Sequence, residues 1–165
     1  GEYEITDAIR WLLDNGYNID YQVLKENWRD IGTPIDVIRE NIGRLSIIEN
    51  NIIGEVVNSH VSGKIILGKG SAIYNSLVRG PIIVGENTII KYSYIGPYTS
   101  IGDKVNIEKS NLENSIIFDG CTIRGVGNSI ENSIIGEGSI IGKEEGIKKF
   151  NKLILGRGSR IYLSS

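Results

Sequence analysis

Two residues with distinctive side-chain chemistry occur once each in this chain of 165 residues, His60 and Cys121. Because a histidine titrates near neutral pH, any histidine-based proton transfer would have to use His60. Its neighbours Ser59 and Ser62 indicate an exposed connection, which favours a surface histidine. Cys121 is a possible nucleophile, but it follows the apolar Ile117 at a spacing that predicts a small inward position, and therefore a buried, inert thiol.

The glycine-rich segment 136–143, GEGSIIGK, superficially resembles a phosphate-binding loop. That motif requires a glycine at position 137 and a serine or threonine at position 144, where this chain has Glu137 and Glu144. We therefore interpret the segment as a turn of the repeat described below.

Composition and charge exclude several classes of protein. The net charge of -2 and the pI near 5.5 provide no basic surface for nucleic acid. A single cysteine cannot form an intrachain disulfide, and no apolar run resembles a signal peptide or a membrane span. We expect a cytoplasmic protein that binds neither nucleic acid nor membrane. With 21 glycines, two phenylalanines and no methionine, a conventional globular core is not expected.

The N-terminal quarter has the pattern of two helices and a strand. Residues 4–16 carry apolar residues at helical spacing, with Thr6 as the expected N-cap and Gly16 as the stop. Residues 18–25 alternate apolar and polar residues and predict a short strand. Thr33, Pro34 and Asp36 together are typical of a helix start, so a second helix is expected to run to about Leu45. Residues 46–58 form a link.

From Val61 onward the chain follows a fixed period. Apolar anchors recur in steps of 6, 6 and 5 residues, with one shorter and one longer step near the end: Val61, Leu67, Ile73, Val78, Val84, Ile90, Ile95, Ile101, Ile107, Leu112, Ile117, Ile123, Ile130, Ile135 and Ile141. Three steps, about 17 residues, predict one coil of a triangular prism on which the next coil stacks.

Small residues and glycines support this interpretation. Four residues after many anchors stands a small or β-branched residue: Ser71, Thr88, Thr99, Val105, Cys121, Ser139 and Ser159. Glycine often follows the anchor directly, as at Gly68, Gly85, Gly96, Gly102, Gly136 and Gly156, and we attribute this to the sharp backbone turns at the prism corners.

Stacked coils also predict ladders on the outer surface. Lys91, Glu108 and Arg124 would then alternate in charge along one edge. The segment 143–152 breaks the rhythm and is expected to be an exposed loop before a last rung, residues 153–161.

The repeat, over residues 61–161, resembles the hexapeptide repeat of left-handed β-helix proteins, and the left hand follows from that resemblance because crossover chirality alone favours the right hand. Three motifs resemble the long form of glucose-1-phosphate thymidylyltransferases: Glu4-Ile5-Thr6-Asp7, Trp28-Arg29-Asp30-Ile31-Gly32-Thr33-Pro34, and Arg79-Gly80-Pro81 followed by residues 95–102. The expected fold is mainly β: a small α/β remnant of the nucleotidyltransferase domain (1–45), a linker (46–58) and a left-handed parallel β-helix (59–165).

The resemblance implies roles for two residues. Asp30 matches the family's Mg²⁺ ligand, which acts with a second aspartate from the nucleotide-binding half, and Mg²⁺ prefers such carboxylates. Glu4 matches a position that borders the sugar pocket. Two structural interpretations remain open: Asp30 as a turn cap, and Glu4 as a surface or helix-entry residue.

The implied parent enzyme makes dTDP-glucose and pyrophosphate from glucose 1-phosphate and dTTP. Its nucleotide loop should lie upstream of Gly1, so these residues alone are expected to be inactive. Two alternatives remain: a β-helix acyltransferase that uses His60, acting on a sugar nucleotide or amino sugar, and a purely structural oligomerisation module. Exposed strand edges and surface tyrosines, Tyr74, Tyr92, Tyr94 and Tyr98, lead us to expect a homo-oligomer, with the N-terminal helices capping one open edge.

Overall fold

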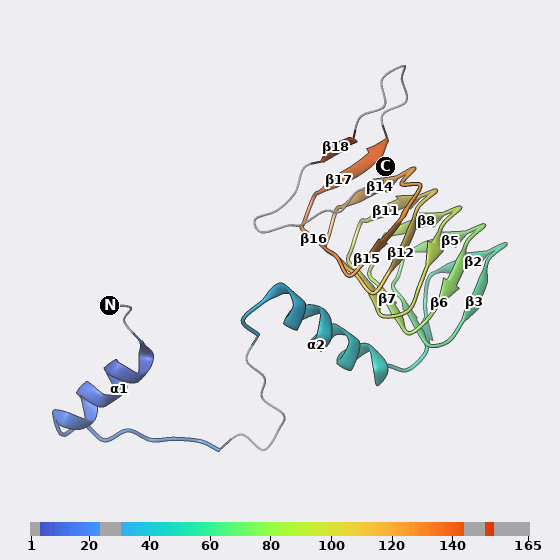
Figure 1. Cartoon of the computed structure of the whole chain (residues 1–165). Helices are drawn as coiled ribbons and strands as arrows, with labels where there is room; N and C mark the ends of the chain where they lie inside the picture. The colour runs from blue at the N-terminus through green and yellow to red at the C-terminus, as the bar shows by residue number, and fades with distance from the viewer. Residues whose placement is uncertain (1–3, 24–30, 144–150, 154–165) are drawn as a thin grey trace. The chain divides into compact units, whose positions relative to one another are not determined.

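The computed structural model describes residues 4–23, 31–143 and 151–153. The chain divides into two compact units, residues 1–30 and residues 31–165, and each is described by itself. The first unit contains helix α1 (Ile5–Asp14). The second contains helix α2 (Pro34–Ser46) and a parallel β-solenoid (Figure 1).

Helix α1 starts at a different cap from the predicted one. Glu4 is the N-cap, and Thr6 lies within the first turn, where its hydroxyl donates to the Glu4 carboxylate at 3.1 Å. The strand predicted over residues 18–25 does not form over residues 18–23, and residues 24–25 lie outside the described part. A strand needs a hydrogen-bonded neighbour, and the described residues of this unit provide none.

Helix α2 starts as predicted, with Thr33 as its N-cap and Pro34 in its first turn. Its inward face is formed by Ile38 and Leu45, both buried, and by the polar Asn41 between them. Because this face packs on the solenoid, the structure groups α2 with the β-helix and not with residues 1–30.

The solenoid consists of three sheets whose strands follow one another around each coil. Sheet A contains β1 (Asn51–Ile52), β4 (Ile65–Leu67), β7 (Ile82–Val84), β10 (Thr99–Ile101), β13 (Ile116–Ile117) and β16 (Ile134–Ile135). Sheet B contains β2 (Glu55–Val57), β5 (Ala72–Tyr74), β8 (Ile89–Lys91), β11 (Asn106–Glu108), β14 (Thr122–Arg124), β17 (Ile140–Lys143) and β18 (Asn151–Leu153). Sheet C contains β3 (His60–Ser62), β6 (Leu77–Arg79), β9 (Tyr94–Ile95), β12 (Asn111–Glu113) and β15 (Ser129–Glu131).

Every pairing is parallel except that of β17 with β18. The predicted fold class, a parallel β-helix behind a short helical segment, is therefore confirmed. Coiling already begins within residues 46–58, the segment expected to be a link, because β1 and β2 pair with β4 and β5. Most of the predicted last rung lies outside the described residues, but Leu153 pairs antiparallel with Ile141.

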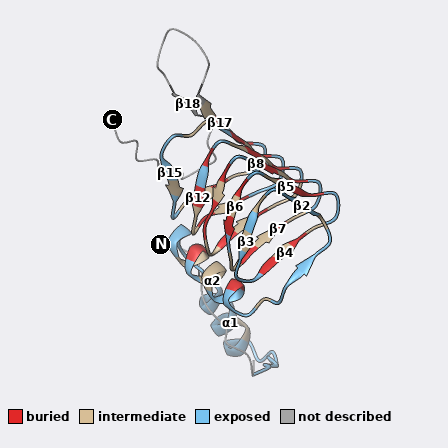
Figure 2. Ribbon diagram, turned by 90° about the vertical axis from the view of Figure 1, so that its right-hand side faces the viewer, coloured by how far each residue is buried: buried red, intermediate tan, exposed pale blue. Residues whose placement is uncertain are grey.

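The predicted anchors form the core. From Leu67 to Ile123 each is at most 2% exposed, and Val61 and Ile130 pack against the same cluster (Figure 2). The predicted small positions are buried as well: Ser71, Thr88, Thr99, Val105, Cys121 and Ser139. Ser159 lies outside the described residues. The ladder register is also confirmed, because Glu108 pairs with Lys91 on one side and with Arg124 on the other.

The reason given for the glycines after the anchors was wrong. Gly68, Gly85 and Gly102 have ordinary backbone angles; a Cβ at these positions would collide with the next coil, at the Gly85 carbonyl, at Asp103 and at Asp119 respectively. These glycines therefore allow close stacking. The left-handed corner conformation belongs to other residues, mostly asparagine and glycine, such as Asn75 at φ 47° and Gly70 at φ 73°.

Hydroxyl groups run up the corners at the period of the coils. Ser59, Ser76, Ser93 and Ser110 each donate to the carbonyl two residues earlier and accept the backbone N–H of a residue one coil later. At another corner, the Thr88 hydroxyl donates to the Gly102 carbonyl at 2.8 Å and accepts from Val105 N at 3.0 Å. These hydroxyls supply hydrogen bonds where the backbone turns and the ladder is interrupted.

Helix α2 lies along the outer face of sheet A and does not cap an end of the solenoid, contrary to the expectation. The residues of sheet A that form this outer row are Ile66, Ile83, Ser100, Ile116 and Ile134. Ser100, the single hydroxyl in the row, donates to Asn41 Oδ1 at 2.6 Å, and Asn41 Nδ2 donates to the Tyr98 carbonyl at 3.0 Å. The hydrogen bonds of Asn41 within an otherwise apolar contact thus define the position of α2 on sheet A.

Candidate functional site

Glu4 lies at the first turn of α1 and is exposed. Its carboxylate accepts the Thr6 hydroxyl, and its backbone N–H donates to Asp7 Oδ2 at 3.3 Å. These contacts agree with the helix-entry interpretation. Nothing in the described residues bears on the sugar-pocket role, which stays a prediction.

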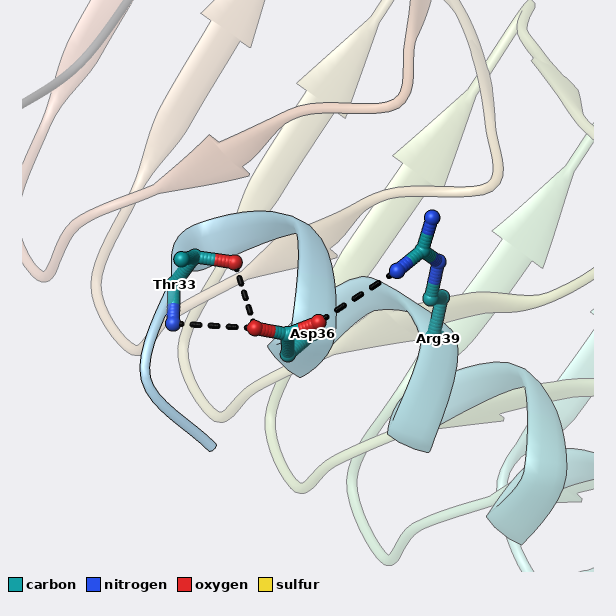
Figure 3. A network of polar contacts seen from close by, with 3 residues as sticks. All are labelled: Thr33, Asp36 and Arg39. Carbon is teal, nitrogen blue, oxygen red and sulfur yellow. Dashed lines mark hydrogen bonds and ion pairs between the residues drawn. The ribbon is translucent and has the colours of Figure 1, made fainter. Parts of the chain in front are cut away.

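Asp30 lies outside the described residues, so its role as a Mg²⁺ ligand also stays a prediction. What the structure does show is the segment that follows it. Thr33 N and Thr33 Oγ1 both donate to Asp36 Oδ2, at 3.1 Å and 2.5 Å (Figure 3). Arg39 Nη1 donates to the other carboxylate oxygen of Asp36, Oδ1, at 3.4 Å.

This network holds the Asp36 carboxylate in its ionised form. The hydrogen bond from the Thr33 side chain, together with the Thr33 backbone and the Arg39 charge, lowers the pKa of Asp36 below its usual value of 3.8. The negative charge also lies in the first turn of α2, where it interacts favourably with the helix dipole. The function of this cluster is therefore to start the helix.

No metal-binding cluster is found within the described ranges. There, no group of three or more histidine, cysteine, aspartate or glutamate side chains lies close enough to hold an ion.

His60 is exposed on β3, and its backbone N–H donates to the Ser76 carbonyl at 3.0 Å. Among the described residues, no hydrogen bond or ion pair holds its imidazole. A histidine that acts as a general base is usually oriented by a carboxylate or carbonyl. The geometry therefore agrees with a surface histidine and gives no support to acyl transfer.

Cys121 occupies the buried corner position that its spacing predicts. Its thiol donates to the Gly136 carbonyl at 3.0 Å, and burial raises the pKa of the Cys121 thiol above its usual value of 9.0. A protonated, covered thiol is a poor nucleophile. The glycine-rich segment that begins at Gly136 is a corner as well, because Gly138 has φ 67° and β17 follows directly.

A small charged cluster that was not predicted from the sequence lies on the outer face of sheet C. Arg79 lies over the Tyr94 ring, 6.0 Å from its centroid, and Tyr94 Oη donates to Glu113 Oε2 at 3.3 Å. Burial is the main cause that raises the pKa of Tyr94 above 10.0, and the negative charge of Glu113 raises it further. Lys91 lies in the same way over Tyr74, at 5.5 Å. Tyr74 and Lys91 are 17 residues apart and occupy paired positions, so the period could have indicated this pair. Arg79 and Glu113 lie two residues from the positions that pair with Tyr94, so the period does not indicate their contacts.

Neither helix in the described ranges is long and apolar enough to cross a membrane.

Comparison with known proteins places the chain in a family. The family model described as the GMPPB C-terminal domain matches residues 78–162, slightly more than half of the chain. The chain belongs to this family.

The similar curated proteins extend the match to the whole chain. A glucose-1-phosphate thymidylyltransferase from Streptomyces griseus is 36% identical over 166 residues, covering 100% of this chain and 46% of that protein. The low-salt glycan biosynthesis nucleotidyltransferase Agl11 from Haloferax volcanii is 38% identical over 169 residues, covering 99% of this chain and 46% of that protein. The chain thus spans just under half the length of these relatives, and the predicted resemblance is confirmed.

A bifunctional protein GlmU from Methanococcus maripaludis is 39% identical over 140 residues, covering 82% of this chain and 34% of that protein. Among solved structures, a hexapeptide transferase family protein from Anaplasma phagocytophilum matches with a TM-score of 0.38 and 18% identity, over 64% of this chain and 86% of that one.

Proposed function

We propose that this chain is the C-terminal part of a sugar-1-phosphate nucleotidyltransferase that joins glucose 1-phosphate to dTTP and releases pyrophosphate. The observation that carries the proposal is the end-to-end similarity to glucose-1-phosphate thymidylyltransferases, at 36% identity. A match across both units is more specific than the β-helix alone, because one fold serves many functions.

In this proposal Asp30 is one of two carboxylates that bind Mg²⁺, the second coming from the nucleotide-binding half. The bound ion would neutralise phosphate charge as the sugar phosphate attacks the α-phosphate of the nucleotide. Glu4 borders the sugar pocket, and the rest of catalysis is the positioning of two substrates.

The solenoid contributes stability and self-association. Its described residues hold no group of histidine, cysteine and carboxylate side chains that could bind a metal ion, whereas its core is continuous along the coils. We place the protein in the cytoplasm, because a single cysteine forms no intrachain disulfide of the kind common in secreted proteins.

The test uses the parent protein that contains these residues. Pyrophosphate release is measured with glucose 1-phosphate, Mg²⁺ and a panel of nucleoside triphosphates; we expect dTTP to be preferred. Preference for another nucleotide would retain nucleotidyl transfer and reject the thymidylyl assignment. No pyrophosphate with any pair of substrates would reject the function.

In this proposal the triphosphate loop lies outside these 165 residues, so a protein of these residues alone is expected to release no pyrophosphate from the same mixture. Transfer from acetyl-coenzyme A to an amino sugar by this shorter protein, lost in His60→Ala, would establish the acyltransferase alternative in its place.

A further inference from the structure

Three hydrogen-bond donors lie next to one another on the outer face of sheet C. His60 and Ser62 belong to β3 and Arg79 belongs to the neighbouring β6 (Figure 1). All three are exposed, whereas the alternate residues Val61 and Val78 pack in the core. Ser62 and Arg79 are paired across the strands, about 4.8 Å apart, and His60 lies about 7 Å from Ser62 along β3.

This part of the face is positively charged, and its donors are free. The ion pairs found in the described part of the chain lie on α2, and no hydrogen bond there holds the His60 imidazole or the Ser62 hydroxyl. The strands β3, β6 and β9 contain no carboxylate, and the exposed Lys64 follows just after β3. The positive charge is therefore local, in a chain whose net charge is -2.

The Arg79 guanidinium is held in place by residues of the next two coils. It lies over the Tyr94 ring, and Tyr94 Oη donates to Glu113 Oε2. Gly96 leaves the space in which these two side chains meet, because a Cβ there would lie 2.6 Å from Glu113 Oε2 and 3.0 Å from Tyr94 Oη. An oriented guanidinium loses less freedom when it binds an anion, so the stacked ring favours binding.

We propose that His60, Ser62 and Arg79 bind the phosphate group of a small phosphate monoester. Such a group has three free oxygens, all acceptors, and a charge of about -2. Arg79 donates two parallel N–H groups to two of these oxygens, and the Ser62 hydroxyl and an imidazole N–H of His60 donate from the β3 side. The site uses neither Glu4 nor Asp30 and goes beyond the proposed nucleotidyl transfer.

The experiment titrates methyl phosphate with the 165-residue chain and follows the phosphorus NMR signal. We expect saturable binding, at least roughly tenfold tighter than that of dimethyl phosphate, which has only two free oxygens. Inorganic phosphate tests the source of the group. Comparable binding of the free ion would support recognition through the phosphate alone, whereas binding of the free ion without methyl phosphate would overturn the monoester.

Two arginine variants locate the site. Arg79→Gln should weaken binding of methyl phosphate at least roughly tenfold. Arg124→Gln is the matched control, because it removes an equally exposed arginine from the same position of its strand, β14, and it should bind as the wild type does. Equal losses in the two variants would show binding to overall charge and would overturn the site.

Tyr94 is a positioning residue in this proposal. Tyr94→Leu should weaken binding several-fold with the net charge unchanged, and Tyr94→Phe should retain it because the ring under Arg79 remains. Circular dichroism and the thermal midpoint check that each variant is folded. Wild-type affinity in Tyr94→Leu would overturn the positioning role.

His60→Gln and Ser62→Ala test the β3 side and serve if Arg79→Gln fails to fold. Each should weaken binding while the thermal midpoint stays that of the wild type, since both side chains are exposed. Unchanged affinity in both, or no saturable binding of methyl phosphate by the wild-type chain, would overturn the proposal. Pyrophosphate release does not enter any of these measurements, so failure of nucleotidyl transfer is a separate result.

Discussion

Helix α1 and the solenoid differ in the exposure of their apolar side chains. In α1, Ile5 is 77% exposed, Trp11 59% and Leu13 58%, and no residue is buried. In the solenoid, the equivalent of each core residue recurs one coil later and covers it. A repeat thus supplies its own packing partner, whereas an amphipathic helix must find one elsewhere. Among the described residues, the burial of apolar side chains that stabilises the fold is therefore concentrated in the solenoid and α2.

The largest effect is expected at Asp30, under the function proposed above. If Asp30 binds Mg²⁺ as proposed, Asp30→Ala in the longer protein is expected to lower turnover a hundredfold or more, about 3 kcal/mol, because a transition-state charge contact would be lost. Turnover is measured across a range of Mg²⁺ concentrations. Asp14→Ala, an exposed carboxylate in α1, is the control and should stay near wild type. Equal rates for the two variants would reduce Asp30 to a turn residue.

For the free energy of unfolding, substitutions in the solenoid should have a larger effect than substitutions in α1. Ile90→Ala removes a fully buried side chain from the middle of the solenoid and is expected to lower the free energy of unfolding by about 3 kcal/mol. Leu13→Ala in α1 removes an exposed one and should change it by less than about 0.5 kcal/mol. Urea denaturation of the 165-residue chain gives both values. Similar losses at the two sites would show that α1 is packed in solution.

The corner hydroxyls should contribute a smaller amount. Thr88→Val keeps the volume but leaves the Val105 N–H and the Gly102 carbonyl without their buried partner. We expect a loss of about 2 kcal/mol in the free energy of unfolding. Thr6→Val, at an exposed hydroxyl in α1, is the control. A loss at Thr88 no greater than at Thr6 would mean that water replaces the missing bonds.

The smallest effect concerns the start of α2. The folded pKa of Asp36 is lowered, so its contribution to stability is present above the unfolded value of about 3.8 and is lost as pH falls through the folded pKa. Asp36→Asn should therefore reduce stability slightly at neutral pH and converge with the wild type in acid. Denaturation midpoints from neutral to acidic pH measure this. A constant difference at all pH values would assign the effect to helix propensity instead of charge.

Much of the solenoid could be predicted because the stacking of successive coils produces both the sequence period and the burial of the core residues. The residue one coil later, about 17 positions along the chain, is stacked on a core residue. The anchors, the small inward positions and the register of Lys91, Glu108 and Arg124 therefore followed from spacing. The cap at Thr33 was predictable because its bonds to Asp36 are local. The N-cap of α1 was missed by two residues, since Glu4, Thr6 and Asp7 all carry capping groups within one turn.

By itself the sequence determined the coil period, the core and the family, because each depends on residues near in the chain or repeated at a fixed interval. Tertiary structure alone decided where α2 packs, through Asn41 and Ser100, which are far apart in the chain and have no shared motif. It also decided why the anchor glycines are needed, since the atoms that exclude a Cβ belong to the next coil. And it decided that Ile52 and Val56 are open, because an end of a stack exists only once the stack is built.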